Sequence, residues 1–210
     1  METEKVEINS DGKEFGRALE VTEELAANLQ LPPKEALRLR LLMEELLGML
    51  REIVTCFQAK VWLESREEER QCCIYLQVDT MMDAKQKKEL LEVSTSGKNM
   101  ANTGIMGRIR GLFETGMDNY ADAKNLQMQY GTGYINFGVL GMVNTNMSNV
   151  YYWSLNKYKD SLKSAKKDTD SETLVEAWDE LEKSIVANLA DEIKVGITKD
   201  KLDLIIEKKW

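Results

Sequence analysis

The sequence predicts an α+β protein, a two-layer α/β sandwich in which helices cover a mixed β-sheet. Three observations support this fold class. Stretches with apolar residues every three or four positions alternate with short runs rich in β-branched and aromatic residues. Hydrophobic residues make up 43% and charged residues 30% of the 210 positions, which is typical of a folded chain with a sizeable core. The sequence contains only two prolines, so long elements can form without interruption.

The first part of the chain predicts a strand, two helices and a hairpin. The adjacent residues Pro32 and Pro33 end the first helix and begin the second, because proline fits the first turn of a helix. The charged sequence SREEER reads as the solvated turn of the hairpin. The predicted elements are a strand at 5–9, helices at 14–29 and 34–57, and strands at 59–64 and 71–79.

The second part predicts further helices and two more strand pairs. Residues 125–156 contain no charged residue, but glycines interrupt this stretch and argue against a membrane helix. The expected elements are helices at 83–93, 104–115 and 171–191, and paired strands at 133–144 with 149–155 and at 192–198 with 202–208. We expect one domain over 1–156 and a C-terminal extension, a helix plus a hairpin, over 157–210.

The expected domain has one mixed sheet, covered on one face by the helices at 14–29, 34–57 and 105–115. Its strands begin near Lys5, Ala59, Gln71, Gly133 and Asn149. The periodicity of these elements selects a set of core residues. The residues expected to be buried are Leu41, Leu46, Leu50, Val61, Ile74, Leu76, Ile135 and Val150.

Charge and composition exclude several classes of function. The chain has 28 basic and 36 acidic residues, and its net charge of −8 opposes binding to nucleic acid or anionic membranes. It contains no histidine, the commonest general base and metal ligand. The three cysteines, Cys56, Cys72 and Cys73, have no metal-binding spacing and predict buried, reduced thiols. Cys72 and Cys73 should point to opposite faces of a strand.

The first ten residues, METEKVEINS, are charged and lack the apolar core of a signal peptide. No charge-free segment is apolar enough to cross a bilayer. We therefore expect a cytoplasmic protein with no membrane partner.

One helix carries a resemblance to a known family. In LRLLMEELLGML, Glu45 stands where the first motif of the GHKL, or histidine-kinase-like ATPase, family has its glutamate. The order of elements over about residues 5–155 is also similar to this family, particularly to its bacterial anti-sigma-factor branch. The family's asparagine four positions later is replaced by Met49, and a thioether is a poor ligand for magnesium. The resemblance thus implies neither a bound metal nor a catalytic residue.

Two further motifs extend the resemblance. Asp79 follows the hairpin, as does the family's adenine-reading aspartate, although no glycine comes directly after it. Gly104 and Gly107 resemble the glycine-rich lid that leads into a phosphate-binding helix. The resemblance implies that Glu45, Asp79, Gly104 and Gly107 line one site for ATP or ADP. Alternatively, Glu45 is the polar edge of an amphipathic helix, Asp79 ends a strand, and the glycines serve turns.

These observations favour a non-catalytic regulatory or protein-binding module on an ATP-binding-like scaffold, with or without residual affinity for a nucleotide. We expect a protein partner, and a homodimer is a further hypothesis. One alternative is an active ATP-dependent kinase or ATPase of the anti-sigma-factor type. A second alternative is a structural or oligomerising protein that binds no nucleotide.

Overall fold

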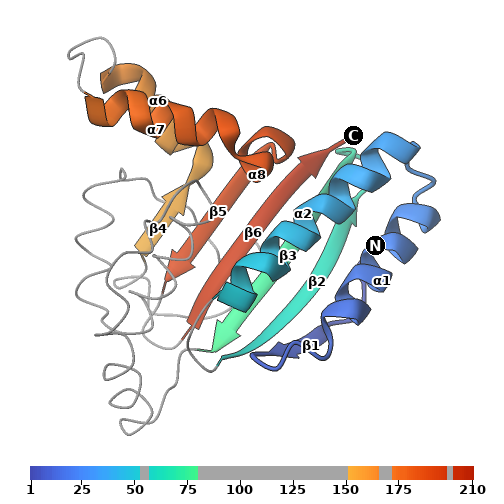
Figure 1. Cartoon of the computed structure of the whole chain (residues 1–210). Coiled ribbons are helices and arrows are strands. Elements are labelled where there is room, and N and C mark those ends of the chain that lie inside the picture. Colours follow the sequence, from blue (N-terminus) through green and yellow to red (C-terminus); the bar gives the residue numbers. More distant parts are fainter. Residues whose placement is uncertain (53–56, 80–150, 166–171, 198–200) are drawn as a thin grey trace, which may run out of the picture.

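A computed structural model describes residues 1–52, 57–79, 151–165, 172–197 and 201–210 (Figure 1). The described residues form a sheet with helices packed against it. In chain order the elements are β1 (Val6–Asn9), α1 (Phe15–Asn28), α2 (Pro33–Glu52), β2 (Gln58–Arg66), β3 (Gln71–Asp79), β4 (Tyr151–Ser154), α6 (Leu155–Ala165), α7 (Glu172–Lys183), α8 (Ile185–Leu189), β5 (Glu192–Ile197) and β6 (Lys201–Lys209). The α+β class expected from the sequence is confirmed.

The sheet has six strands in the order β1-β2-β3-β6-β5-β4. Each pair of neighbours is antiparallel, so the prediction of a mixed sheet is wrong for the described strands. The reason is partly local, because β2 with β3 and β5 with β6 are hairpins, and a short turn can join only antiparallel strands.

The C-terminal hairpin is part of this sheet rather than an extension. β6 pairs with β3 over the whole length from Gln71 to Asp79, and β5 follows on its other side. The boundary predicted after residue 156 falls inside α6. β6 is suited to a central position because Leu204, Ile205 and Ile206 are buried on both of its faces.

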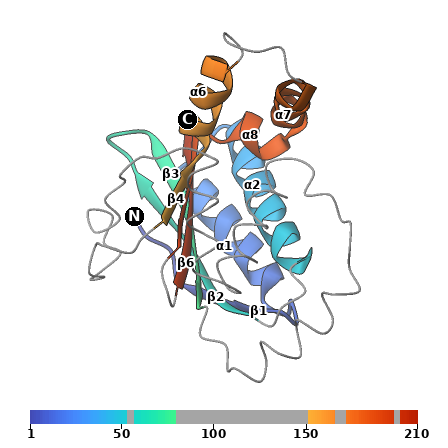
Figure 2. The ribbon, with the colours of Figure 1, turned by 90° about the vertical axis from the view of Figure 1, so that its left-hand side faces the viewer.

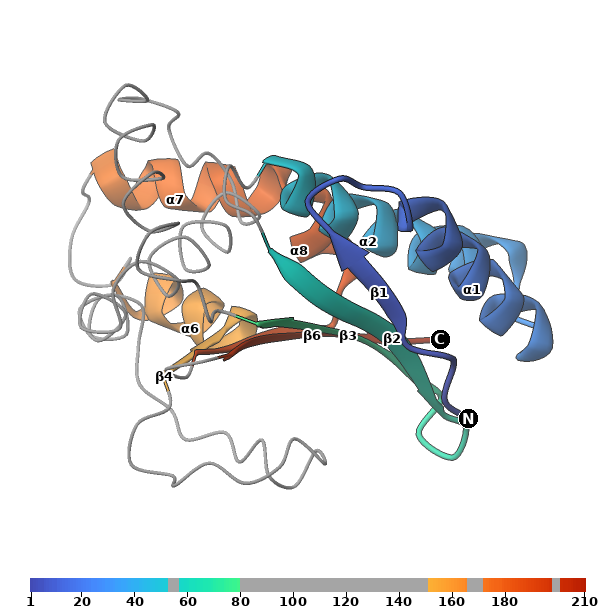
Figure 3. The same cartoon turned by 90° about the horizontal axis from the view of Figure 1, so that it is seen from below.

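Helices α1, α2 and α8 lie on the same face of the sheet (Figures 2 and 3). The alternation of β2 and β3 directs Val61, Ile74 and Leu76 toward this layer, where they join the core with Leu46 and Leu50 of α2. Burying each of these side chains stabilises the fold by roughly 1.5–3 kcal/mol. These five core predictions are confirmed.

Three other core predictions have different outcomes. Leu41 is only half-buried, because the helical repeat turns it away from the buried Leu39 and Leu46 of α2. Ile135 and Val150 lie outside the described residues, as do the predicted elements at 83–93, 104–115 and 133–144. Within the described ranges, no helix has both the length and the apolar character that crossing a membrane requires.

Candidate functional site

The structure does not bring the two described residues of the predicted nucleotide site together. Glu45 is half-buried on α2, on the helical side of the sheet. Asp79 ends β3 as an exposed residue, and alternation places it on the opposite face with Gln77 and Tyr75. Gly104 and Gly107 lie outside the described residues. The one cavity that these residues were expected to share is therefore not formed by Glu45 and Asp79.

Met49 is a core residue. It is 4% exposed and belongs to the same buried cluster as Leu46 and Leu50. A position with so little access to solvent packs the helix against the sheet and offers nothing to a ligand. A methionine at this position is thus explained by packing.

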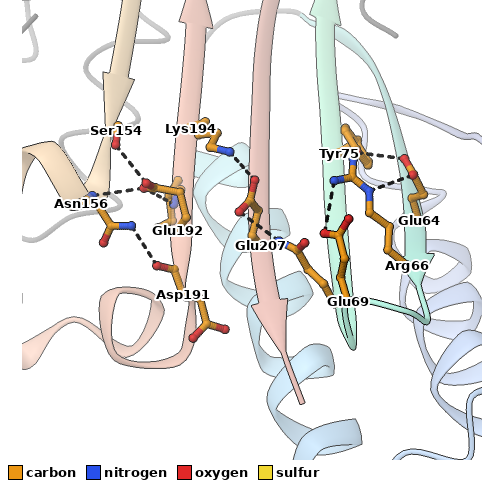
Figure 4. A network of polar contacts seen from close by, with 12 residues as sticks. Glu64, Arg66, Glu69, Tyr75, Ser154, Asn156, Asp191, Glu192, Lys194 and Glu207 are labelled. Carbon is orange, nitrogen blue, oxygen red and sulfur yellow. Dashed lines mark hydrogen bonds and ion pairs between the residues drawn. The ribbon is translucent and has the colours of Figure 1, made fainter. Parts of the chain in front are cut away.

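A polar network covers the face of the sheet opposite the helices (Figure 4). The strand register places Glu64 beside Cys73, Cys73 beside Glu207, and Glu207 beside Glu192, across β2, β3, β6 and β5. We call Glu64, Glu207 and Glu192 the acidic row. Carboxylates on neighbouring strands repel one another, so each must find compensating partners.

At one end of the acidic row, Glu64 accepts hydrogen bonds from the Tyr75 hydroxyl at 3.0 Å and from Arg66 Nε at 3.3 Å. The Tyr75 ring stacks on Trp62 with centroids 5.1 Å apart and planes inclined by 6°. Lys5 Nζ lies 4.6 Å from the centroid of the Trp62 ring. Tyr75 and Arg66 thus hold the Glu64 carboxylate, and Trp62 and Lys5 extend this cluster through ring contacts.

At the other end, Glu207 forms an ion pair with Lys194 and accepts a hydrogen bond from Gln71 Nε2 at 3.0 Å. Glu192 accepts hydrogen bonds from Ser154 Oγ and from the backbone N–H of Asn156, both at 3.1 Å. Asn156 lies in the first turn of α6, so Glu192 satisfies one of the free N–H groups at this helix start. The network thus fixes β4 and α6 to the sheet.

Cys72, Cys73 and Tyr75 on β3 are unsuited to nucleophilic or acid–base chemistry near neutral pH. Burial is the main cause that raises the pKa of Cys73 to about 11 and that of Cys72 to about 12. Burial also raises the pKa of Tyr75 far above its ordinary value, with smaller contributions from Cys73 and Glu64. The thiols stay protonated, as predicted for buried cysteines on opposite faces of a strand. Among the described residues, no group of three or more Cys, Asp or Glu side chains is placed to hold a metal ion.

A groove on the outer side of the helical layer is the second candidate site. It lies between α1 and α2 near the turn that joins them, and its volume is about 540 Å³. This is within the usual range for ligand pockets. Its lining is mainly apolar, with three polar or charged side chains at the rim. The lining residues are Glu23, Ala26, Ala27, Gln30, Leu31, Ala36, Leu37 and Arg40. We call this set the α1–α2 groove.

The local sequence explains how the α1–α2 groove forms. Gln30 has a left-handed backbone (φ 50°) and ends α1, with its N–H bonded to the carbonyl of Ala27 at 3.0 Å. The N–H of Leu31 bonds to the carbonyl of Ala26, also at 3.0 Å, which completes a Schellman motif. The chain then enters α2 at Pro33, as predicted. Alanines on both helices leave space between them, and Leu37 stands at the rim with 55% of its surface exposed.

Two arginines form ion pairs with glutamates on or near α1 and α2. Arg40 reaches Glu23 on α1 and Glu44 on α2, both at 3.1 Å. Arg17 contacts Glu4 at 2.6 Å, Glu24 at 2.9 Å and Glu20 at 3.2 Å. The hydrogen bonds that Arg17 donates to these carboxylates, that to Glu24 first, raise the pKa of Arg17.

Sequence reasoning missed the α1–α2 groove. At 3.6 residues per turn, Leu37 points away from the buried Leu39, Leu42 and Leu46 of the same helix. The periodicity of one helix does not show that a neighbouring helix forms a cavity beside such a residue. The available signal was the presence of alanines on both sides of the proline pair, at Ala26, Ala27 and Ala36.

Comparison with known proteins gives no relative: no protein-family model, no curated protein and no solved structure matches this chain. The resemblance to the GHKL family therefore remains a prediction.

Proposed function

We propose that this chain is a non-catalytic protein-binding module that contacts its partner through the α1–α2 groove. The observation that carries the proposal is an apolar, open cavity with Leu37 exposed at its rim. The large hydrophobic residues exposed in the described part of the chain are Met1, Leu37, Val175 and Ile185, and Leu37 lines the α1–α2 groove. An exposed apolar side chain beside an apolar cavity is typical of an interaction site.

The chemistry of the sheet also favours binding over catalysis. The chain has no histidine, and the raised pKa values of Cys72, Cys73 and Tyr75 leave these groups protonated. The carboxylates of the acidic row are engaged in hydrogen bonds and ion pairs. The proposal requires no nucleotide, and ATP or ADP binding at Glu45, Asp79, Gly104 and Gly107 stays a separate prediction.

A peptide-display selection tests the proposal. The full chain is the bait, and the affinity of each enriched peptide is then measured for the unmodified chain and for the Leu37→Glu variant. We expect enriched peptides with apolar anchor residues, and we expect Leu37→Glu to weaken their binding at least about tenfold, since a buried leucine contact is worth roughly 1.5–3 kcal/mol.

The matched control is Val175→Glu, which places the same charge at another exposed apolar position, 62% exposed, on α7. This variant should bind the selected peptides as the unmodified chain does. Peptides that bind the Leu37→Glu variant with unchanged affinity, or a selection that enriches nothing, would contradict the proposal.

A further inference from the structure

We infer that the segment bound in the α1–α2 groove is a basic amphipathic helix. This inference rests on the proposed function and specifies the chemistry of the partner.

The first argument is the row of exposed carboxylates on α1 that leads to the groove, whose own lining holds one acidic residue, Glu23, and one basic residue, Arg40. Arg17 contacts three carboxylates and Arg40 contacts two, so the two arginines cannot neutralise the five glutamates around them. The side chains of Glu20, Glu23 and Glu24 are 65%, 55% and 59% exposed. Their negative charge is therefore open to a cation from another molecule.

The second argument is the position of these glutamates. Residues three, four and seven apart lie along one side of a helix, so Glu20, Glu23, Glu24 and Ala27 form one ridge of α1. Glu23 and Ala27 line the groove directly. A cationic residue of a bound segment would meet this ridge while its apolar side chains enter the groove beside Leu37. Such charge complementarity guides both partner choice and orientation.

The third argument concerns the backbone of the segment bound in the groove. The walls of the groove are α1 and α2, whose own backbone groups are engaged within the helices (Figure 1). An extended segment would find no sheet edge here with which to pair its N–H and C=O groups. A helix satisfies these groups internally and offers an apolar stripe, which is the helix-in-groove mode of recognition.

Three designed helical peptides test the inference on the full chain. They share one leucine- and alanine-based apolar face, and their polar faces carry lysine, glutamine or glutamate. Binding is measured by fluorescence anisotropy at two salt concentrations. We expect the lysine peptide to bind most tightly, to weaken at high salt, and to lose affinity with Leu37→Glu.

Charge variants of the protein locate the effect. The double variant Glu20→Gln and Glu24→Gln should weaken the affinity for the lysine peptide by roughly three- to tenfold, as expected for the loss of two exposed ion pairs. Its matched control is Glu67→Gln with Glu68→Gln, which makes the same charge change in the exposed β2–β3 turn. This control should leave the affinity unchanged.

The outcomes separate the two proposals. If the glutamine or glutamate peptide binds as tightly and Leu37→Glu weakens it, the groove is a docking site but the partner is not basic. If both double variants weaken binding of the lysine peptide equally, the peptide responds to the overall charge of the protein and not to the glutamates of α1. The inference is then wrong. If none of them binds while the display selection enriches other peptides that depend on Leu37, the inference is wrong and the proposed function stands. If Leu37→Glu affects none of the peptides that bind, the proposed function is overturned as well.

Discussion

Single polar residues on the sheet face are held in arrangements that offset the cost of their burial. Lys194 and Glu207 are the clearest pair, with side chains 20% and 16% exposed. Removing one partner of such a pair would leave an uncompensated charge, which costs far more than the intact pair contributes. Gln71 supplies a further hydrogen bond to Glu207. The network is therefore better understood as a way to fix strand register than as a store of reactive groups.

Burial makes the ionisation of the Asp203 carboxyl group less favourable. Burial is the main cause that raises the pKa of Asp203, while a hydrogen bond from Gln77 Nε2 at 2.9 Å opposes the shift. A raised pKa in the folded state means that stability is full below the unfolded pKa, about 3.9, and falls as the pH rises through the folded value. The charged form of Asp203 thus destabilises the native protein at neutral pH.

We therefore expect Asp203→Asn to raise the free energy of unfolding at neutral pH. The asparagine carbonyl can still accept the hydrogen bond from Gln77, so the variant removes only the charge. The gain should narrow as the pH falls toward the unfolded pKa of aspartate. Urea denaturation across this pH range measures the gain in unfolding free energy. The control is Asp160→Asn, which changes an exposed side chain on α6. A gain that is independent of pH would contradict this explanation.

Local periodicity predicted where most helices and strands begin and end, but it did not predict which strands pair with one another. The helices expected at 14–29 and 34–57 correspond to α1 and α2, and the hairpin strands are found within a few residues of their predicted bounds. The helix predicted at 171–191 is instead α7 and α8, because the hydroxyl of Ser184 accepts a hydrogen bond from Ala187 N–H and starts a new helix.

The pairing of β3 with β6 joins segments more than a hundred residues apart, which no local pattern specifies. Only the consecutive apolar residues Leu204, Ile205 and Ile206 hinted that β6 is buried on both faces. The candidate site has the same limit. The α1–α2 groove depends on how closely Ala26 and Ala27 approach Ala36, and that distance is set by packing.

The buried face of α2 gives a prediction that separates packing from nucleotide chemistry. Met49→Asn restores the asparagine of the GHKL motif in the core, where its amide would lack partners. We expect the free energy of unfolding to fall by about 3 kcal/mol, from lost apolar contact and buried polarity. Met49→Leu preserves volume and should cost less than about 1.5 kcal/mol. A Met49→Asn variant that is stable and gains magnesium-dependent ADP binding would favour the ATPase alternative instead.

For the molecule as a whole, the two layers separate two kinds of surface. Figure 2 shows α1 and α2 on one side of the sheet. The acidic row lies on the opposite face of the sheet, and the α1–α2 groove lies between the two helices. A partner seated in the groove would therefore leave the polar network of the sheet untouched. A partner that required the acidic row would instead contact β2, β3, β5 and β6.

Hydrogen exchange of the full chain, with and without the lysine-bearing amphipathic peptide, tests the central claim most directly. We expect the peptide to slow exchange over residues 23–40, because binding restrains the end of α1, the turn at Gln30 and Leu31, and the start of α2. Exchange in β2, β3 and β6 should be unchanged. Slowed exchange confined to those strands, or no change anywhere at saturating peptide, would contradict the assignment of the α1–α2 groove as the binding site.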